Sequence, residues 1–83
     1  MDETSAGWDD LHLFLAVARE GGLSPAARAT GRSAATLGRR MLALERAMGR
    51  ELFVRHDRGY ELTAEARRLL DDLSEVEARI VRL

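Results

Sequence analysis

The sequence predicts a mainly α-helical fold with one short β-hairpin and a long C-terminal helix. Three observations predict it. Apolar side chains recur at helical spacing along residues 8–20 and 33–48, and a glycine follows each segment. Residues 51–63 contain two short β-forming runs around a glycine, which is typical of a hairpin. From Thr63 onward, apolar residues keep a heptad-like spacing to the end of the chain.

The composition of the 83 residues indicates one soluble globular domain, with 46% hydrophobic and 33% charged residues. The sequence has no cysteine, so disulfides and thiolate zinc sites are excluded. The N-terminal segment MDETSAGWDD is acidic rather than signal-like, and the longest apolar run, LFLAVA, is too short to cross a bilayer. We therefore expect a cytoplasmic protein without a membrane segment.

Positive charge is concentrated in the middle of the chain. All thirteen basic residues are arginine, and residues 21–60 hold eight of them against three acidic residues. Both flanking segments carry more acidic than basic residues. The use of arginine instead of lysine has two alternative explanations, a GC-rich genome or a preference for planar anionic partners, and a GC-rich genome does not explain why the arginines lie in the middle of the chain. Since arginine prefers planar anionic partners such as phosphate and the guanine edge, the middle segment is a candidate nucleic-acid contact.

The first predicted helix covers residues 8–20 and ends at Gly21-Gly22. Its second apolar strip, Leu13 and Val17, lies off the main one, so we expect this helix to contact two neighbours. The second helix is expected to have Ser24 as its N-cap and Pro25 at its first position, and to end near Gly31. The main apolar stripe of the first helix comprises Trp8, Leu11, Phe14, Leu15 and Ala18.

The third predicted helix starts at its N-cap, Ser33, and ends at Gly49. Its buried stripe is expected to contain Leu37, Met41, Leu44 and Met48. Two helices joined by a short turn that contains glycine form a helix-turn-helix. The hairpin that follows, ELFVR and YELT around Gly59, is then a wing, which completes a winged helix-turn-helix over residues 1–62.

The last predicted helix covers residues 63–83 and forms the second unit of the chain, with Thr63 as its N-cap. It extends about 30 Å, which is farther than a domain of about 60 residues can cover. Part of its apolar face is therefore expected to need a partner. That face is a heptad seam that consists of Ala66, Leu69, Leu73, Val76, Ile80 and Leu83.

The outward face of the third helix is small and basic. On a helical wheel, the residues opposite or beside the buried stripe are Ala35, Gly38, Arg39, Leu42 and Arg46. Gly38 costs about 1 kcal/mol of helix stability relative to alanine. We interpret this cost as a consequence of close approach to DNA, because a major groove about 12 Å wide admits the small front end of a helix. The alternative is an alanine-glycine seam that packs against another protein element.

These motifs resemble the N-terminal DNA-binding domain of the LysR-type transcriptional regulators. The similarity runs from about Trp8 to Leu70 and includes the segments FLAVAREGG, SPAA, LGRRMLALE, MGRELFVR and RGYELT. It implies a winged helix-turn-helix that binds double-stranded DNA as a homodimer to regulate transcription, with the long C-terminal helices paired antiparallel. The dimer interface that it implies comprises Leu13, Val17, Ala66, Leu69, Leu73, Val76, Ile80 and Leu83.

The resemblance also implies a set of DNA-contacting residues. Arg39 matches the family's contacting arginine, Arg40 stands where the family has glutamine or arginine, and Arg58 resembles its minor-groove arginine. Arg55 either pairs within the fold or contacts phosphate, and Arg28 and Arg32 are either phosphate contacts or simply solvated. The full candidate set is Ser24, Arg28, Arg32, Ser33, Ala34, Ala35, Thr36, Gly38, Arg39, Arg40, Arg55 and Arg58.

Two departures from the family pattern change this expectation. Ala34 replaces the usual glutamine of the recognition helix and Gly38 replaces the usual serine, so few side chains remain to read bases directly. We expect specificity to depend on Arg39, Arg40 and DNA shape. The family's effector-binding domain, and with it a small-molecule ligand, is not expected in this chain, which is either an excised DNA-binding module or a natural stand-alone one.

No enzymatic, cofactor or metal site is expected. His12 and His56 have no second ligand at metal spacing. The sequence has no nucleophile paired with a base, no catalytic carboxylate pair and no phosphate-binding glycine loop. The alternative function is a winged-helix module that binds protein and uses the heptad seam for assembly. A steep salt dependence of binding to duplex DNA distinguishes DNA binding from this alternative.

Overall fold

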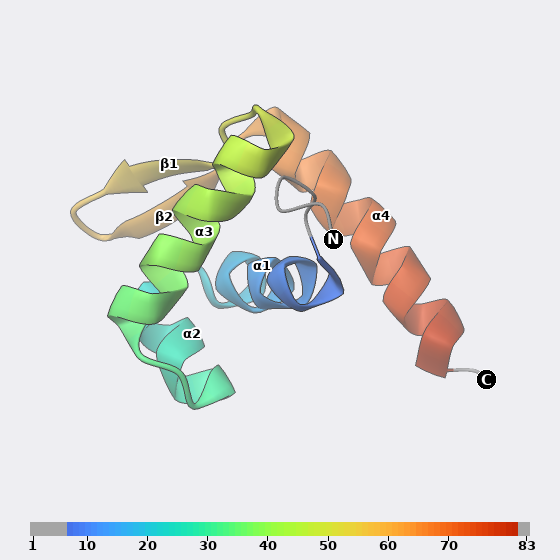
Figure 1. Cartoon of the computed structure of the whole chain (residues 1–83), viewed down its shortest axis with the longest axis horizontal. Coiled ribbons are helices and arrows are strands. Elements are labelled where there is room, and N and C mark those ends of the chain that lie inside the picture. Colours follow the sequence, from blue (N-terminus) through green and yellow to red (C-terminus); the bar gives the residue numbers. More distant parts are fainter. Residues whose placement is uncertain (1–6, 82–83) are drawn as a thin grey trace.

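The computed structural model describes residues 7–81 and confirms the predicted mainly α-helical winged fold. In chain order, its elements are α1 (Trp8–Glu20), α2 (Leu23–Thr30), α3 (Ala34–Met48), β1 (Phe53–His56), β2 (Gly59–Leu62) and α4 (Ala64–Val81). Helix α1 lies in the centre, with α2 and α3 on one side and α4 on the other (Figure 1). Of the helices in the described part of the chain, none combines the length and apolarity that a bilayer crossing needs.

Helix α1 supplies the centre of the hydrophobic core. Leu13, Phe14, Leu15 and Val17 are all buried, which confirms that both apolar strips of α1 have neighbours. The ring of Phe14 lies 5.6 Å from the ring of Phe53, so the core joins the helices to the hairpin. Trp8 departs from the prediction, because it is 44% exposed and stacks beside the ring of His12 instead of entering the core.

The helix ends follow the predicted chemistry with one exception. The Ser33 hydroxyl accepts a hydrogen bond from the Thr36 N–H at 3.1 Å, which confirms the N-cap of α3. The prediction for α2 was wrong, because this helix starts at Leu23 with Gly22 as its N-cap, and Ser24 lies inside the first turn. Pro25 is tolerated there because the first N–H groups of a helix have no partner within the helix.

The hairpin contacts the turn between α1 and α2 through Gly59 and Tyr60. Strands β1 and β2 are antiparallel, with Phe53 opposite Leu62 and His56 opposite Gly59. The Tyr60 N–H donates to the Gly21 carbonyl oxygen at 3.2 Å. A side chain at Gly59 would place its Cβ 2.8 Å from that same oxygen, and φ is +143° there, so only glycine allows this close approach.

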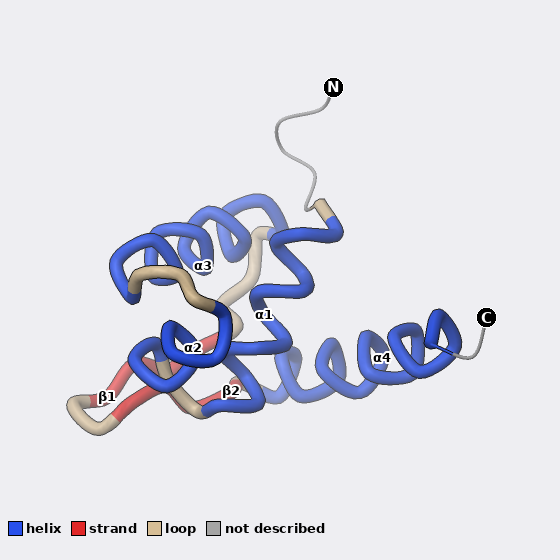
Figure 2. The backbone as a smooth tube through the Cα atoms, turned by 90° about the horizontal axis from the view of Figure 1, so that it is seen from below, coloured by secondary structure: helices blue, strands red, loops and turns tan. Residues whose placement is uncertain are grey.

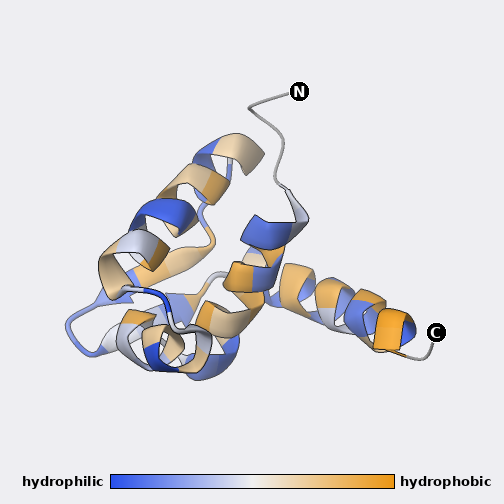
Figure 3. Cartoon of the chain, turned by 60° about the horizontal axis from the view of Figure 1, so that its bottom comes forward, coloured by the Kyte–Doolittle hydropathy of each residue, from blue (hydrophilic) through white to orange (hydrophobic). Residues whose placement is uncertain are grey.

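Helix α4 leaves the body of the molecule as an arm (Figure 2). Its first half is anchored, since Thr63 caps the helix through the Ala66 N–H and both Ala66 and Leu73 are buried. Beyond Leu73 the seam is open, with Val76 45% and Ile80 51% exposed. Apolar residues continue along α4 to its free end (Figure 3), and Leu83 of the predicted seam lies outside the described residues. We call Ser74–Val81 the arm.

Candidate nucleic-acid interface

The front end of α3 presents small side chains and one arginine to solvent. Ala35 and Arg39 are exposed, and Ala34 is half-buried. The Ser33 hydroxyl donates to Thr36 Oγ1 at 2.8 Å, and an Arg39 guanidinium N–H lies 3.4 Å from the same oxygen. These bonds place the Arg39 side chain over the first turn of α3. This end of the helix therefore combines a positive charge with little steric bulk.

Several other candidate residues lie on the same side of the molecule as this end of α3 (Figure 1). The first turn of α3, helix α2 and the turn of the hairpin lie on one side of the molecule, away from the free end of α4 (Figure 1). Ser24 at the start of α2 and Arg58 at the wing line the same shallow hollow. Arg28 and Arg32 are exposed in and just after α2. The fold thus gathers residues from three segments of the sequence on one face.

The arginines of residues 21–60 divide into two groups. Three of them form ion pairs with carboxylates of residues 7–81, namely Arg40, Arg50 and Arg55. The other five are exposed and form no ion pair with a carboxylate of this part of the chain: Arg28, Arg32, Arg39, Arg46 and Arg58. An exposed arginine without a carboxylate partner keeps its full charge for an external anion. We call these five residues the open arginines.

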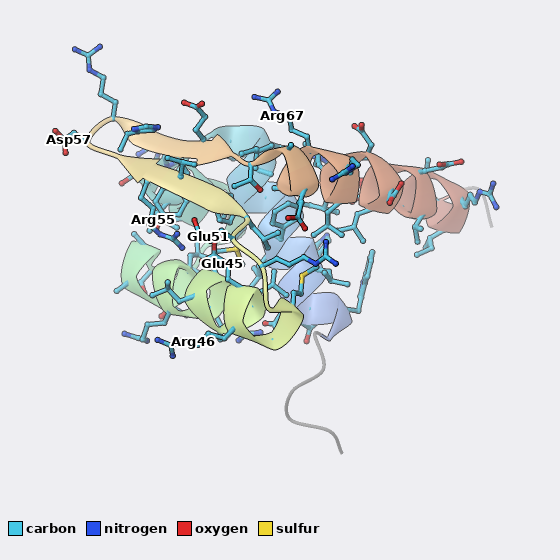
Figure 4. All side chains as sticks on the ribbon, turned by 90° about the horizontal axis from the view of Figure 1, so that it is seen from above. Glu45, Arg46, Glu51, Arg55, Asp57 and Arg67 are labelled. Atoms are coloured by element: carbon cyan, nitrogen blue, oxygen red, sulfur yellow. The ribbon has the colours of Figure 1, made fainter. Side chains whose placement is uncertain are left out.

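Arg46 was missing from the predicted set of DNA-contacting residues. It lies on the outward face of α3 and points away from Glu45 and Arg55 (Figure 4). The helical wheel carried the signal that could have found it, because the wheel placed Arg46 on the same side as Arg39.

Arg40 is turned toward α1 rather than outward. Its Nε donates to Asp10 Oδ1 at 2.7 Å, and its Nη2 lies 2.6 Å from the same oxygen. The side chains of Arg40 and Asp10 are 39% and 29% exposed, so the pair is partly withdrawn from water. A helical wheel of α3 alone could not show that an acidic residue 30 positions earlier faces Arg40. In this arrangement Arg40 is engaged by the fold, unlike its neighbour Arg39.

Gly38 serves a contact between α2 and α3. A Cβ atom at this position would lie 3.2 Å from Leu23 Cδ1, which is tighter than ordinary side-chain packing. Gly38 therefore packs closely against Leu23 of α2, and the interpretation that it also permits close approach to DNA stays a prediction. Ala35 and Arg39 stay exposed beside it. The glycine that lowers helix stability at this position thus also lets α2 and α3 pack closely.

Glu45 is a buried carboxylate that joins α3 to the wing. It accepts hydrogen bonds from the N–H groups of Leu52 and Phe53, at 2.8 and 3.2 Å, and from Arg55 Nη2 at 2.7 Å. Burial alone raises the pKa of Glu45, but the hydrogen bonds from Arg55 and the two backbone groups outweigh it, so the pKa lies below its ordinary value. Arg55 therefore pairs within the fold, which is one of its two predicted roles, and its contact with phosphate stays a prediction.

Several residues of the predicted dimer interface are already covered by their own chain. Leu13, Val17 and Ala66 are buried, and Leu73 is only 8% exposed. Of the predicted interface residues within 7–81, Val76 and Ile80 are exposed and Leu69 is partly buried. Among the described residues, no group of three or more histidine, aspartate and glutamate side chains is arranged to hold a metal ion.

Comparison with known sequences matches most of the chain to one family. Residues 8–67 match the bacterial regulatory helix-turn-helix proteins of the lysR family. The HTH-type transcriptional regulator TfdT of Cupriavidus pinatubonensis is 43% identical over 72 residues, which are 87% of this chain and 32% of TfdT. The chain therefore spans about a third of that relative's length.

Solved structures show the same fold. A crystal structure of the CbnR DNA-binding domain in complex with DNA has a TM-score of 0.84 and 34% sequence identity, over 93% of this chain and 88% of that one. The full-length structure of the Vibrio cholerae virulence activator AphB has a TM-score of 0.84 and 33% identity, over 92% of this chain and 26% of AphB. Both likenesses extend beyond the winged domain into α4.

Proposed function

This chain belongs to the lysR family of bacterial regulatory helix-turn-helix proteins, and we propose that it regulates transcription by binding double-stranded DNA selectively as a homodimer. The observation that carries this proposal is the group of open arginines, of which Arg39 lies at the front end of α3 and Arg46 in its last turn. Their charges are not neutralised by carboxylates of residues 7–81. The crystal structure of the CbnR DNA-binding domain with DNA, whose fold this chain shares, supports the same assignment.

Helix α3 enters the major groove with its N-terminal end toward the bases. Ala34 and Ala35 allow this approach because they add little bulk, and Arg39 reaches a base edge. The Thr36 hydroxyl accepts hydrogen bonds from Ser33 and Arg39, which leaves its own proton to donate to a phosphate or a base. Direct readout therefore depends mainly on Arg39, and DNA shape supplies the remaining selectivity.

The surrounding residues hold the DNA backbone. Arg58 at the wing inserts into the neighbouring minor groove, where a narrow groove attracts arginine. Arg28, Arg32 and Ser24 contact phosphates on either side of α3, and Arg46 contacts a phosphate farther along the groove. Such contacts position the protein without reading sequence. Binding to chromosomal DNA would place the protein in the bacterial cytoplasm.

The homodimer forms through the arm. Val76 and Ile80 are exposed on one face of α4, and an antiparallel copy of the same helix covers them with a self-complementary surface. The two α3 helices then face successive major grooves, as two-fold symmetric DNA-binding dimers require. Leu69 lies at the inner edge of this contact, since it is partly buried against its own core.

A salt titration with neighbouring arginine variants tests DNA binding. The probe is a duplex enriched from a random-sequence pool by the wild-type protein, and the observable is the dissociation constant between about 50 and 200 mM salt. We expect the logarithm of the binding constant to fall by about 0.9 per neutralised phosphate for each unit of log salt. Arg39→Ala should cost about 1–3 kcal/mol and relax selectivity, and Arg28→Ala should weaken all sequences equally.

Arg40→Ala is the matched control for Arg39→Ala, because the two residues are adjacent but only Arg39 is open. We expect Arg40→Ala to leave DNA affinity within about twofold of wild type, because the Arg40 side chain is paired with Asp10 and this ion pair contributes less than about 1 kcal/mol to folding. A flat salt dependence, or failure of the wild type to enrich any duplex, would contradict the proposal. That result would favour a winged module that binds protein through its arm.

A further inference from the structure

The direction of the arm is set by few contacts. Packing of the seam ends at Leu73, and the next two seam positions, Val76 and Ile80, are about half exposed. Within residues 7–81, the side-chain hydrogen bonds that join α4 beyond Leu73 to the rest of the chain all come from one residue of α1, Arg19. The rest of α4 is fixed from Thr63 to Leu73, at the other end of the helix.

Arg19 contacts two successive turns of α4. Its Nη2 donates to Ser74 Oγ at 3.0 Å and to Glu77 Oε1 at 2.9 Å. The hydrogen bond and the positive charge of Arg19 hold the pKa of Glu77 below its ordinary value. Since the two acceptors are three residues apart, rotation or tilting of α4 would break at least one of these bonds. We call these three residues the α4 clamp.

We propose that the α4 clamp fixes the direction of the arm and thereby determines which spacing of DNA half-sites the homodimer accepts. Arg19 acts as a positioning residue that does not touch DNA. This inference rests on the proposed function, because it presupposes that two copies pair through their arms. It goes beyond that function by assigning the choice of spacing to three residues outside the helix-turn-helix.

Geometry explains why a small contact can matter. The two α3 helices of a dimer are connected only through their bodies and arms, so a change of angle at the root of each arm changes the distance between them. The second-longest axis of the molecule measures 27 Å. A rotation of about 10° at the root of the arm moves a point at that distance by about 5 Å, which is more than one base-pair step of about 3.4 Å.

The direction of the arm can be measured within one chain. The sequence contains no cysteine, so Ala47→Cys on α3 and Ala78→Cys on the arm provide two unique sites for spin labels. Both positions are exposed. Labelled chains are diluted with unlabelled chains, so that the measured distance lies within one subunit. In the Arg19→Ala variant we expect the distribution of this distance to become at least twice as wide as in the wild type.

Two further variants separate the clamp from a general loss of charge. Arg79→Ala removes an exposed arginine that pairs with Glu75 within α4 and does not reach α1, so it should keep the wild-type distance distribution. The exchange of charges in Arg19→Glu with Glu77→Arg restores an ion pair between α1 and α4 and should narrow the distribution again. If Arg19 served only the stability of the fold, Arg19→Ala would lower the free energy of unfolding but would leave the width of the distance distribution unchanged, and the charge exchange would have no widening to reverse.

Selection from random duplex DNA measures the spacing. We expect the wild type to enrich paired half-sites with one dominant spacing, and Arg19→Ala to enrich the same half-sites with spacings that are each within two- to threefold of one another. The inference would be overturned if Arg19→Ala kept the wild-type width of the label-distance distribution, or if it still enriched half-sites with one dominant spacing. If the wild type enriches no paired half-sites, the proposed function as a dimer fails as well. If the wild type enriches one dominant spacing and Arg19→Ala enriches the same spacing, only the inference about the α4 clamp is overturned.

Discussion

The two halves of α4 carry the same apolar spacing but differ in what covers it. Up to Leu73 the seam is packed against the core of the winged domain, whereas Val76 and Ile80 are about half exposed. Heptad spacing shows which side chains share a face of a helix, and the extent of the neighbouring elements decides which of them are covered. Substitutions in the first half should therefore change folding, and substitutions in the second half should change assembly.

Leu73→Asp is expected to have the largest effect. Its side chain is 8% exposed and belongs to the core cluster, so the substitution removes buried apolar surface and introduces a charge without a partner. We expect a loss of more than about 4 kcal/mol of unfolding free energy, which is most of the stability of a small domain. Urea unfolding followed by circular dichroism measures it.

The control for this prediction lies on the same seam. Val76→Asp combined with Ile80→Asp should leave the unfolding free energy within about 1 kcal/mol of wild type when it is measured on dilute, monomeric protein. The same variant should sediment as a monomer at concentrations where the wild type is dimeric. A folded monomer from Leu73→Asp, or unfolding by the arm variant, would show that α4 is not divided at Leu73.

Glu45→Gln is expected to have an intermediate effect that is confined to the body. The Glu45 side chain is 10% exposed and accepts hydrogen bonds from two backbone N–H groups and from Arg55. Glutamine keeps one acceptor oxygen but loses the charge. Since Arg55 is 36% exposed and can be hydrated after the change, we expect a cost of about 1–3 kcal/mol rather than the larger cost of a fully buried pair.

The effect of Glu45→Gln should depend on pH. The pKa of Glu45 is lowered in the folded protein, so the unfolded chain takes up the proton first as the pH falls. The stabilisation is therefore complete well above the ordinary value of 4.5 and is lost as the pH falls through the lower, folded value. The difference between wild type and variant, measured by urea unfolding, should shrink between pH 5 and pH 3. A constant difference over this range would mean that charge pairing contributes little.

The sequence predicted the parts of the fold that depend on local chemistry. Ser33 and Thr63 cap their helices as expected, because an N-cap depends only on a side-chain oxygen and the next turn of backbone. The buried stripe of α3 follows from the helical period, since Leu37, Met41 and Leu44 are all buried. The family motifs then identified the order of the elements.

Contacts between distant segments could not be predicted in this way. The wheel of α3 placed Gly38 near the outward face, and it did not show that Leu23 of α2 packs against it. Likewise, nothing in the pattern around Arg40 indicates Asp10, and the pairing of Arg55 with Glu45 stayed one of two alternatives. In each case the missing information was the direction of approach of a second helix or strand, which periodicity does not contain.

The smallest effect is expected for Arg50→Ala, and it sharpens the comparison between the two ends of α4. Arg50 pairs with Glu65 in the first turn of α4, but the two side chains are 60% and 42% exposed, so the stability should change by less than about 1 kcal/mol. The distance between labels at positions 47 and 78 should stay as narrow as in the wild type, because Thr63 and the buried Ala66 hold this end of the helix without Arg50. If Arg50→Ala widened that distance as much as Arg19→Ala, the arm would move with α4 as one rigid rod. The division at Leu73 would then have no mechanical meaning.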